Sequence, residues 1–274
     1  MANIDSAPRS RLAGLRVTAG ASIAFGPGEP VSRLRSLREW GGYRVKFPDA
    51  AGRAEAVLLN TGGGVAGGDC LQVAVSLEAG AALTFTTQSA ERIYRSMDEP
   101  ARIDVRLALA GGADLAYIPQ ETILFSKARL KRSITAELAE SSHLLLAETV
   151  VFGRTAMGEV VATGAFADSW RIRRGGNLIY ADEVRLEGPI HDLLQRPAIG
   201  QGAQSVGTIL LVAPEAAERC EEARAILTNA ECRAAASTWN GLLCVRLLGS
   251  AGGVRKTAAA IIAGLSRHPL PRVW

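Results

Sequence analysis

Apolar residues alternate with other residues in three segments of the first half of the chain: 73–77, 103–109 and 134–138. An alternation with period two is typical of β-strands that bury one face. Glycine, proline, aspartate and asparagine divide the same region into short pieces, as in chains built mostly of strands. The pattern therefore predicts a mainly β body over residues 1–205.

These three strands belong to a repeating unit. Each strand leads through a turn of small residues into a second apolar strand, in the segments 77–83, 109–115 and 138–144. The leucine that ends the first strand recurs at positions 77, 109 and 138, at intervals typical of solenoids. The repeat predicts a two-layered, β-helix-like stack of hairpins. An ordinary antiparallel β-protein with evenly spaced hairpins is the alternative.

The pattern changes after residue 205. Residues 206–213 are an apolar run that predicts a buried strand, and Pro214 followed by acidic residues predicts a helix to about Asn229. A further strand over 241–248 leads into an amphipathic helix over 254–266. We expect residues 206–274 to form a small α+β segment with two helices, packed on the body as one folding unit.

Composition narrows the class of protein. The chain has 274 residues, 48% of them hydrophobic, and a formal net charge of +4. That charge is too small to indicate a nucleic-acid partner, and each apolar run is shorter than the ~20 residues that span a bilayer. Residues 1–11 are polar and contain no apolar core of a signal peptide. We therefore expect a cytoplasmic protein with no membrane partner.

Residues that commonly carry chemistry are few and scattered. The four cysteines, Cys70, Cys220, Cys232 and Cys244, form no C-x-x-C pair, and His143, His191 and His268 lie far apart in sequence. These spacings indicate neither a zinc site nor a disulfide framework. No G-x-S-x-G segment is present, so the sequence predicts no catalytic residue.

Two glycine-rich segments imitate nucleotide sites. Residues 62–67 satisfy G-x-G-x-x-G, but a strand rather than a helix is predicted after them, so we expect a tight loop between strands. Residues 249–257 end in Lys-Thr like a phosphate-binding loop, but Ser250 and Arg255 occupy the positions that require glycine. We expect no nucleotide site in either segment.

The first of these segments is more specific than a generic loop. Residues 60–69 (NTGGGVAGGD), 87–95 (TQSAERIYR), 117–125 (YIPQETILF), 153–154 and 271–274 together resemble the UreD family of urease accessory proteins, called UreH in some systems. One departure is Arg92, where many members carry lysine. The motif residues are Asn60, Thr61, Gly62, Gly63, Gly64, Gly67, Gly68, Asp69, Gln88, Tyr94, Arg95, Pro119, Gln120, Glu121, Gly153 and Arg154.

The resemblance implies a maturation factor that is not an enzyme. In that family the protein binds UreF directly and the GTPase UreG through the complex, and the assembly loads nickel into apo-urease. No tightly bound cofactor is implied, only transient Ni²⁺. The implied fold is two layers of β-sheet in a helical arrangement with a small helical part.

Dispersed carboxylates and amides suit a protein through which nickel passes, because thiolates and multiple histidines would hold Ni²⁺ too tightly to release it. The repeat places Gln88, Gln120 and Glu148 at comparable points after the second strands. The candidate residues for nickel passage are Asp69, Glu91, Glu121 and Glu148.

Two alternatives stay open. The same acids could pair with Arg92, Arg95 or Arg154 and only hold the fold. The chain could also be a β-rich small-molecule-binding protein or enzyme with a pocket at the glycine-rich loop 60–69.

Overall fold

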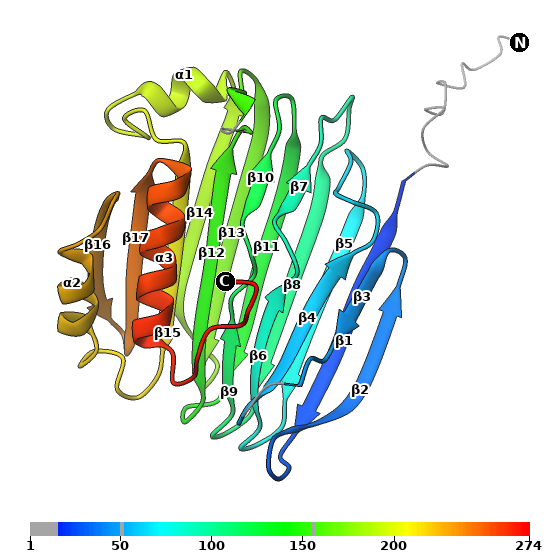
Figure 1. The fold of residues 1–274 in the computed structure, drawn as a ribbon, viewed down its shortest axis with the longest axis vertical. Coiled ribbons are helices and arrows are strands. Elements are labelled where there is room, and N and C mark those ends of the chain that lie inside the picture. Colours follow the sequence, from blue (N-terminus) through cyan, green and yellow to red (C-terminus); the bar gives the residue numbers. More distant parts are fainter. Residues whose placement is uncertain (1–15, 50–51, 155–156) are drawn as a thin grey trace, which may run out of the picture.

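The structure is a computed structural model that describes residues 16–49, 52–154 and 157–274 (Figure 1). Residues 1–11, which carry the expectation of no signal peptide, lie outside these ranges. The elements are β1 (Thr18–Gly26), β2 (Arg33–Trp40), β3 (Tyr43–Lys46), β4 (Ala54–Asn60), β5 (Cys70–Leu77), β6 (Ala82–Thr87), β7 (Glu91–Ile93), β8 (Ala101–Leu109), β9 (Asp114–Tyr117), β10 (Thr122–Leu124), β11 (Arg129–Leu138), β12 (His143–Phe152), β13 (Gly164–Arg174), β14 (Asn177–Gly188), α1 (Ile190–Gln195), β15 (Ser205–Val212), α2 (Cys220–Leu227), β16 (Arg233–Trp239), β17 (Leu242–Gly249) and α3 (Ala251–Leu265).

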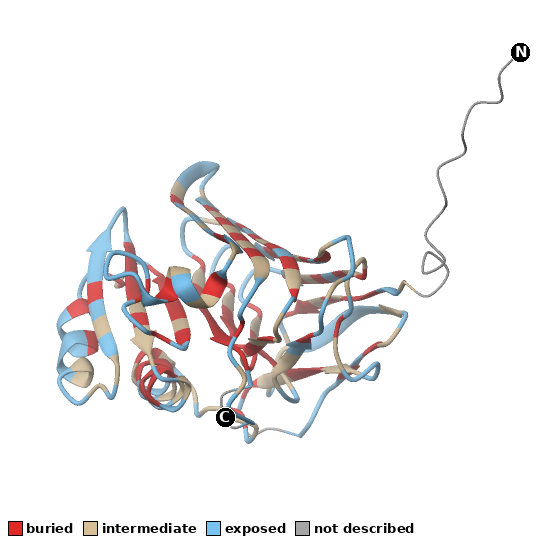
Figure 2. Cartoon of the chain, turned by 90° about the horizontal axis from the view of Figure 1, so that it is seen from above, coloured by how far each residue is buried: buried red, intermediate tan, exposed pale blue. Residues whose placement is uncertain are grey.

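The strands form two sheets that lie face to face as separate layers (Figure 2). Sheet A has the order β14-β13-β11-β8-β5-β1-β2, and sheet B has the order β16-β17-β15-β12-β9-β6-β4-β3. The short strands β7 and β10 pair with each other, and β10 also pairs with β12. The chain passes from one sheet to the other in about four turns of a β-solenoid, which confirms the predicted fold.

The sequence repeat has a direct structural cause. Leu77 pairs with Leu109, and Leu109 pairs with Leu138, in parallel ladders between β5, β8 and β11. Residues one repeat apart therefore stack on one another and bury equivalent side chains in the same column of the core. The predicted strands 73–77, 103–109 and 134–138 are all confirmed.

The units of the stack are arches rather than the predicted hairpins. After the turn that follows β5, the chain enters the other sheet, so β5 pairs with β1 and β8 while β6 pairs with β4 and β9. Gly80 and Gly112 turn the chain with φ values of 71° and 68°, which side chains disfavour. Crossing between sheets lets both strands of an arch direct apolar residues into one core.

The last quarter of the chain extends sheet B. β15 pairs with β12 in antiparallel fashion, and β17 and β16 follow it outward. Helices α2 and α3 cover the outer face of these strands, where Ile209, Val245 and Ile261 belong to a second apolar cluster (Figure 1). The predicted α+β character of this region is confirmed. Within the described ranges, no helix is both long and apolar enough to cross a membrane.

The helix boundaries differ from the prediction. α2 begins at Cys220 rather than Pro214, because the intervening residues form tight turns with hydrogen bonds such as Glu218 N to Glu215 O at 3.1 Å. α3 begins at Ala251, three residues earlier than predicted, and the Ser250 hydroxyl caps it by accepting from Gly253 N at 3.2 Å. The short helix α1 carried too little periodicity to be predicted.

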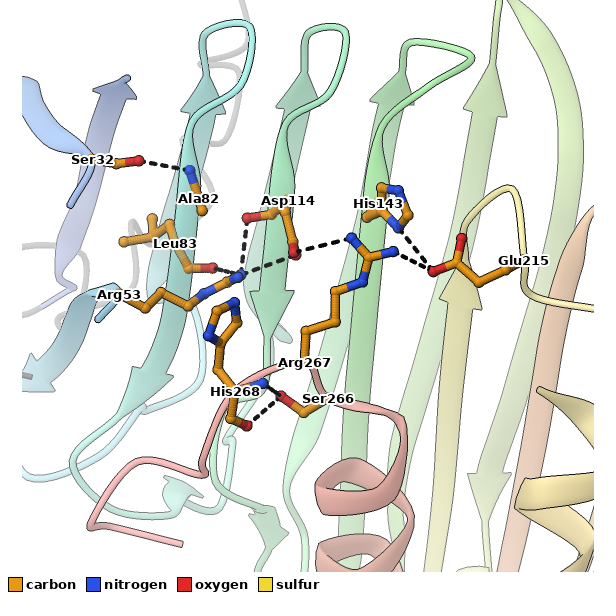
Figure 3. A network of polar contacts seen from close by, with 10 residues as sticks. All are labelled: Ser32, Arg53, Ala82, Leu83, Asp114, His143, Glu215, Ser266, Arg267 and His268. Carbon is orange, nitrogen blue, oxygen red and sulfur yellow. Dashed lines mark hydrogen bonds and ion pairs between the residues drawn. The ribbon is translucent and has the colours of Figure 1, made fainter. Parts of the chain in front are cut away.

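A polar network ties the segment after α3 to the outer face of sheet B (Figure 3). Arg267 forms ion pairs with Glu215 and, at 3.9 Å, with Asp114 on β9. The buried Arg53 donates through Nη2 to the Asp114 carboxylate at 3.1 Å. The chain then crosses the sheet and ends at Trp274, whose indole N–H donates to Ile118 O at 2.8 Å.

Replacing a leucine of the stacked core should destabilise the fold. Leu115 on β9 is 0% exposed, so Leu115→Ala should lower the free energy of unfolding by about 2–5 kcal/mol. Leu178 is 46% exposed, and Leu178→Ala should change the free energy of unfolding by less than ~0.5 kcal/mol. Urea denaturation of both variants measures the difference, and equal losses would contradict the assignment of the core.

Candidate functional site

The glycine-rich segment forms the connection from β4 to β5. Gly64 has a φ of 148°, and a Cβ there would lie 2.4 Å from the Tyr94 ring and 2.8 Å from Arg92 O. The Tyr94 hydroxyl donates to Gly63 O at 2.9 Å. The glycines let the loop pack directly on β7, which confirms the predicted tight loop between strands.

This packing places Asn60, the last residue of β4, beside Glu91 on β7. The Asn60 side-chain amide donates to the two Glu91 carboxylate oxygens at 3.0 and 3.2 Å. The buried Tyr43 hydroxyl donates to Glu91 Oε2 at 3.3 Å. Burial raises the pKa of Glu91, and the hydrogen bonds from Asn60 and Tyr43 offset part of that rise.

Deeper between the sheets, one arginine joins carboxylates from both layers. Arg132 on β11 donates to Asp168 on β13 at 2.9 Å through Nε and at 2.6 Å through Nη2. Its Nη1 donates across the core to Glu148 on β12, and to Thr122 Oγ1 at 3.3 Å. All four side chains are buried. Tyr117 lines the same cavity as Arg132 and Glu148. We call these five residues, together with Tyr43, Asn60 and Glu91, the polar row.

The polar row holds more negative than positive groups. Burial and, to a smaller extent, the nearby Asp168 raise the pKa of Glu148 to about 7, although the charge and hydrogen bond of Arg132 act in the opposite direction. For Arg132, burial disfavours the charged guanidinium, but the attractions of Asp168 and Glu148 prevail, so its pKa is raised. A single guanidinium thus faces two carboxyls. This inner end of the polar row, formed by Arg132, Asp168 and Glu148, therefore favours the binding of a proton or another cation.

Two small cavities have Glu91 as a common lining residue. One, of about 80 Å³, is lined by Asn60, Gly64 and Gln88 at the glycine loop, and the other, of about 50 Å³, lies between the sheets beside Glu148. Leu58, Thr87 and Glu91 line both. Each cavity exceeds the ~10–15 Å³ that a water molecule needs. Glu91 therefore lies between the glycine loop and the inner end of the polar row.

The structure brings together two of the four residues predicted for nickel passage. Glu91 and Glu148 line the inner cavity. Asp69 instead accepts from Val17 N and Ala66 N, each at 2.8 Å, so both of its oxygens bind backbone. Glu121 accepts from Arg255 of α3.

The predicted arginine partners are not the ones the structure shows. Glu148 pairs with Arg132 and Glu121 pairs with Arg255, while Arg154 pairs with Glu159 at 2.8 Å. Neither Arg92 nor Arg95 forms an ion pair within the described part of the chain. If Glu148 and Glu121 stabilise the fold, they do so through Arg132 and Arg255 rather than through the predicted arginines.

The three polar residues after the second strands lie at related levels of the stack. Pairing of Leu83 with Leu115 puts Gln88 level with Gln120, and pairing of Thr122 with Val150 puts Gln120 level with Glu148. Gln88 lines the outer cavity, and Gln120 lines the inner one while its Oε1 accepts from Arg255 at 2.9 Å. The repeat therefore does carry these residues to the same side of the stack, where Gln88 is exposed and Gln120 and Glu148 are buried.

Most other motif residues hold the loops near the glycine segment. Thr61 Oγ1 donates to Gly42 O at 2.8 Å, and Arg95 forms an antiparallel bridge with Ala128. Gly153 has a φ of 93°, and a Cβ there would lie 2.3 Å from Glu159 O. The Arg154 guanidinium lies 4.7 Å from the Phe125 ring centroid.

Sequence reasoning missed Arg132 and Asp168. Their positions in the alternation of buried and exposed residues could have identified them. Arg132 follows the buried Leu130 by two residues, and Asp168 follows the buried Phe166 by two. Each therefore occupies an inward position of its strand. A charged residue on the apolar face of a strand must find a buried partner.

No group of three or more histidine, cysteine, aspartate or glutamate side chains in the described ranges is placed to hold a metal ion. All four cysteines are free; Cys220 and Cys244 are buried, and Cys70 and Cys232 are half-buried. What the polar row offers a cation is therefore individual carboxylate, amide and hydroxyl oxygens.

A family model described as the UreD urease accessory protein matches residues 17–274. The chain belongs to the UreD family. It is 52% identical over 258 residues to urease accessory protein UreD 1 of Methylobacterium radiotolerans, covering 92% of this chain and 90% of that one. It is 44% identical over 270 residues to UreD of Azorhizobium caulinodans, covering 98% of each chain. The family predicted from the sequence motifs is thereby confirmed.

Within this UreD fold, Asp69 should prove structural. Asp69→Ala leaves two backbone N–H groups without their acceptor, so we expect it to lower the free energy of unfolding by about 1–3 kcal/mol. Asp69→Asn keeps one acceptor oxygen and should lose less. Chemical denaturation compares the two, and an unchanged Asp69→Ala variant would contradict this role.

Glu148 should make stability fall as the pH rises. Its pKa is about 7 in the folded state against 4.5 ordinarily, so the folded state binds more protons between these values. Stability therefore decreases as the pH rises through this window. In thermal unfolding between pH 5 and 8, the melting temperature of the native protein should fall more steeply with pH than that of Glu148→Gln. The exposed Glu137→Gln should retain the native slope, and identical slopes in all three proteins would contradict the burial of this charge.

Proposed function

We propose that this chain is a urease maturation factor that binds UreF directly, brings the GTPase UreG to apo-urease through that complex, and passes nickel toward the urease active site. Its membership of a family of urease accessory proteins supports this role. The proposal makes the protein a cytoplasmic, non-enzymatic scaffold that holds Ni²⁺ only in transit. It requires no nucleic-acid or membrane partner.

The observation that carries the nickel role is the position of Glu91. Its carboxylate lines the cavity at the glycine loop and the cavity that contains Glu148. An ion that entered beside Gln88 would meet Glu91 before it reached Glu148. The row thus supplies successive oxygen ligands from the surface loop into the space between the sheets.

The chemistry of these ligands suits passage better than storage. Carboxylate and amide oxygens bind Ni²⁺ less tightly than thiolates or clustered imidazoles, so the ion is not trapped. At Glu148, an arriving cation would compete with a proton and with Arg132. Arg132 could release Glu148 while keeping its two hydrogen bonds to Asp168, which lowers the cost of the exchange.

The alternative, a small-molecule pocket at the glycine loop, finds less support. The cavity there measures about 80 Å³, well below the ~300–1,000 Å³ of typical ligand pockets. Neighbouring side chains also occupy the space over the glycines: a Cβ on Gly68 would lie 2.6 Å from Arg16, and one on Gly67 would lie 2.2 Å from Ser96.

Nickel loading of urease tests the proposal. Glu91→Gln and Glu148→Gln keep side-chain size and remove the charge. Each variant is produced together with UreF, UreG and urease, and the nickel content of the purified urease is measured by mass spectrometry. We expect a reduction of about tenfold, corresponding to ~1.4 kcal/mol at a limiting step, with UreF still co-purifying in native amount.

The matched controls are Glu137→Gln and Glu183→Gln, which remove exposed carboxylates from sheet A. Normal nickel content in both Glu91→Gln and Glu148→Gln would refute passage along the polar row. A loss of UreF binding by native-like preparations of these variants would assign the two acids to complex formation instead.

A further inference from the structure

Strand β2 is the free edge of sheet A at the end of the stack opposite to β14 (Figure 1). Among the described residues it pairs only with β1, and residues 33–38 are all exposed. An edge strand presents unpaired backbone N–H and C=O groups, which are a template for another strand.

Each of the other three sheet edges is either short or has a main-chain carbonyl that accepts from an arginine side chain. β3 has only four residues. On β16, Ala236 O accepts from Arg224 of α2 at 3.3 Å, and on β14, Asp182 O accepts from Arg171 at 3.2 Å. In the described structure, the backbone of residues 34–40 forms hydrogen bonds with β1 alone. β14 is longer, with twelve residues, and within the described ranges only its Asp182 carbonyl is occupied in this way. β2 is thus one of the two long edges of sheet A, and it is the one whose described backbone has no partner besides β1.

The side chains of β2 define what could pair with it. On the outward face, Arg38 has no carboxylate within 4.0 Å in the described ranges, and the same holds for Arg33 near the start of the strand. On the inward face, Leu34 and Leu37 are each 40% exposed, because the four residues of β3 cannot cover the eight of β2. Glu39 lies on the same face and accepts from Val45 N at 2.6 Å. Phe47, just after β3, is 39% exposed.

A strand beside β2 would bury these leucines through cross-strand contacts and face Arg38 with its outward side chains. The complementary segment therefore alternates apolar with acidic residues. An arginine-rich edge also repels basic segments, so the charge selects among partners as well as attracting one.

A second copy of this chain fits poorly. Ser36 pairs with Ala24 and Leu34 with Phe25, so Arg35 is the extra residue of a bulge and the regular part of the strand is residues 36–40. The antiparallel register that pairs all five of these residues sets Arg38 opposite its own copy. Like charges directly opposite each other destabilise a strand pair.

We propose that β2 is a docking edge that binds an extended segment of a partner protein, with alternating acidic and apolar residues, by adding it as a further strand of sheet A. The backbone supplies the hydrogen bonds, Leu34 and Leu37 supply the apolar contact, and Arg38 supplies the selectivity. This inference is independent of nickel passage, and its failure would leave the proposed function untouched.

Fluorescence anisotropy with the full chain tests this edge. The probe is a labelled, end-capped eight-residue peptide that alternates glutamate and valine. It should bind the native protein with a Kd below about 1 mM, and at least tenfold more weakly to Arg38→Glu. The lysine–valine peptide should show the opposite preference. A glutamate–valine peptide methylated at every backbone nitrogen keeps the charges, loses the donors and should not bind.

Arg106→Glu is the matched control, because Arg106 is exposed on the central strand β8 and its substitution changes the net charge equally. It should bind the peptide like the native protein. Equal weakening by Arg38→Glu and Arg106→Glu, equal binding of the methylated peptide, or no binding up to ~1 mM would overturn the proposal. A native dimer in sedimentation that Arg38→Glu dissociates would also overturn it, in favour of a second copy.

Discussion

The arrangement of the strands around the interior depends on the contact of Arg132 with Asp168 and Glu148. One guanidinium must satisfy carboxyls from both sheets in a space that is largely shielded from solvent. Removing one partner of such a buried pair typically costs about 3–5 kcal/mol, because the remaining charge has no other partner. This requirement holds β11, β12 and β13 at a fixed separation and keeps a polar row open in an otherwise apolar core.

The solenoid explains how the fold can contain such a row. Parallel sheets are usually covered on both faces, because helices make the crossovers between their strands. Here the crossovers of sheet A are strands of sheet B, so the outer face of sheet A stays in water and its strands alternate buried with exposed residues. The one core lies between the layers, and polar groups at the same level of successive turns come together there.

The two ends of the stack differ in a way that bears on function. At one end, β15 to β17 and the helices extend and cover sheet B. At the other end, β3 is half as long as β2 and leaves apolar residues uncovered. In a member of the UreD family of urease accessory proteins, the open edge and the polar row are the two features of the stack that suit contact with other molecules.

The sequence by itself determined the strand repeat, the mainly β fold, the helical end and the family. Period-two alternation and the recurrence of Leu77, Leu109 and Leu138 depend on local geometry and on stacking between neighbouring turns, so they are visible along the chain. The sequence also indicated Glu91 and Glu148 as candidate residues for nickel passage. Only the tertiary structure decided that β5 and β6 lie in opposite sheets, because a turn does not reveal whether its strands pair. Likewise, the grouping of Arg132 with Asp168 and Glu148, and the separation of Asp69 and Glu121 from them, depend on contacts between strands distant in sequence, which spacing along the chain does not encode.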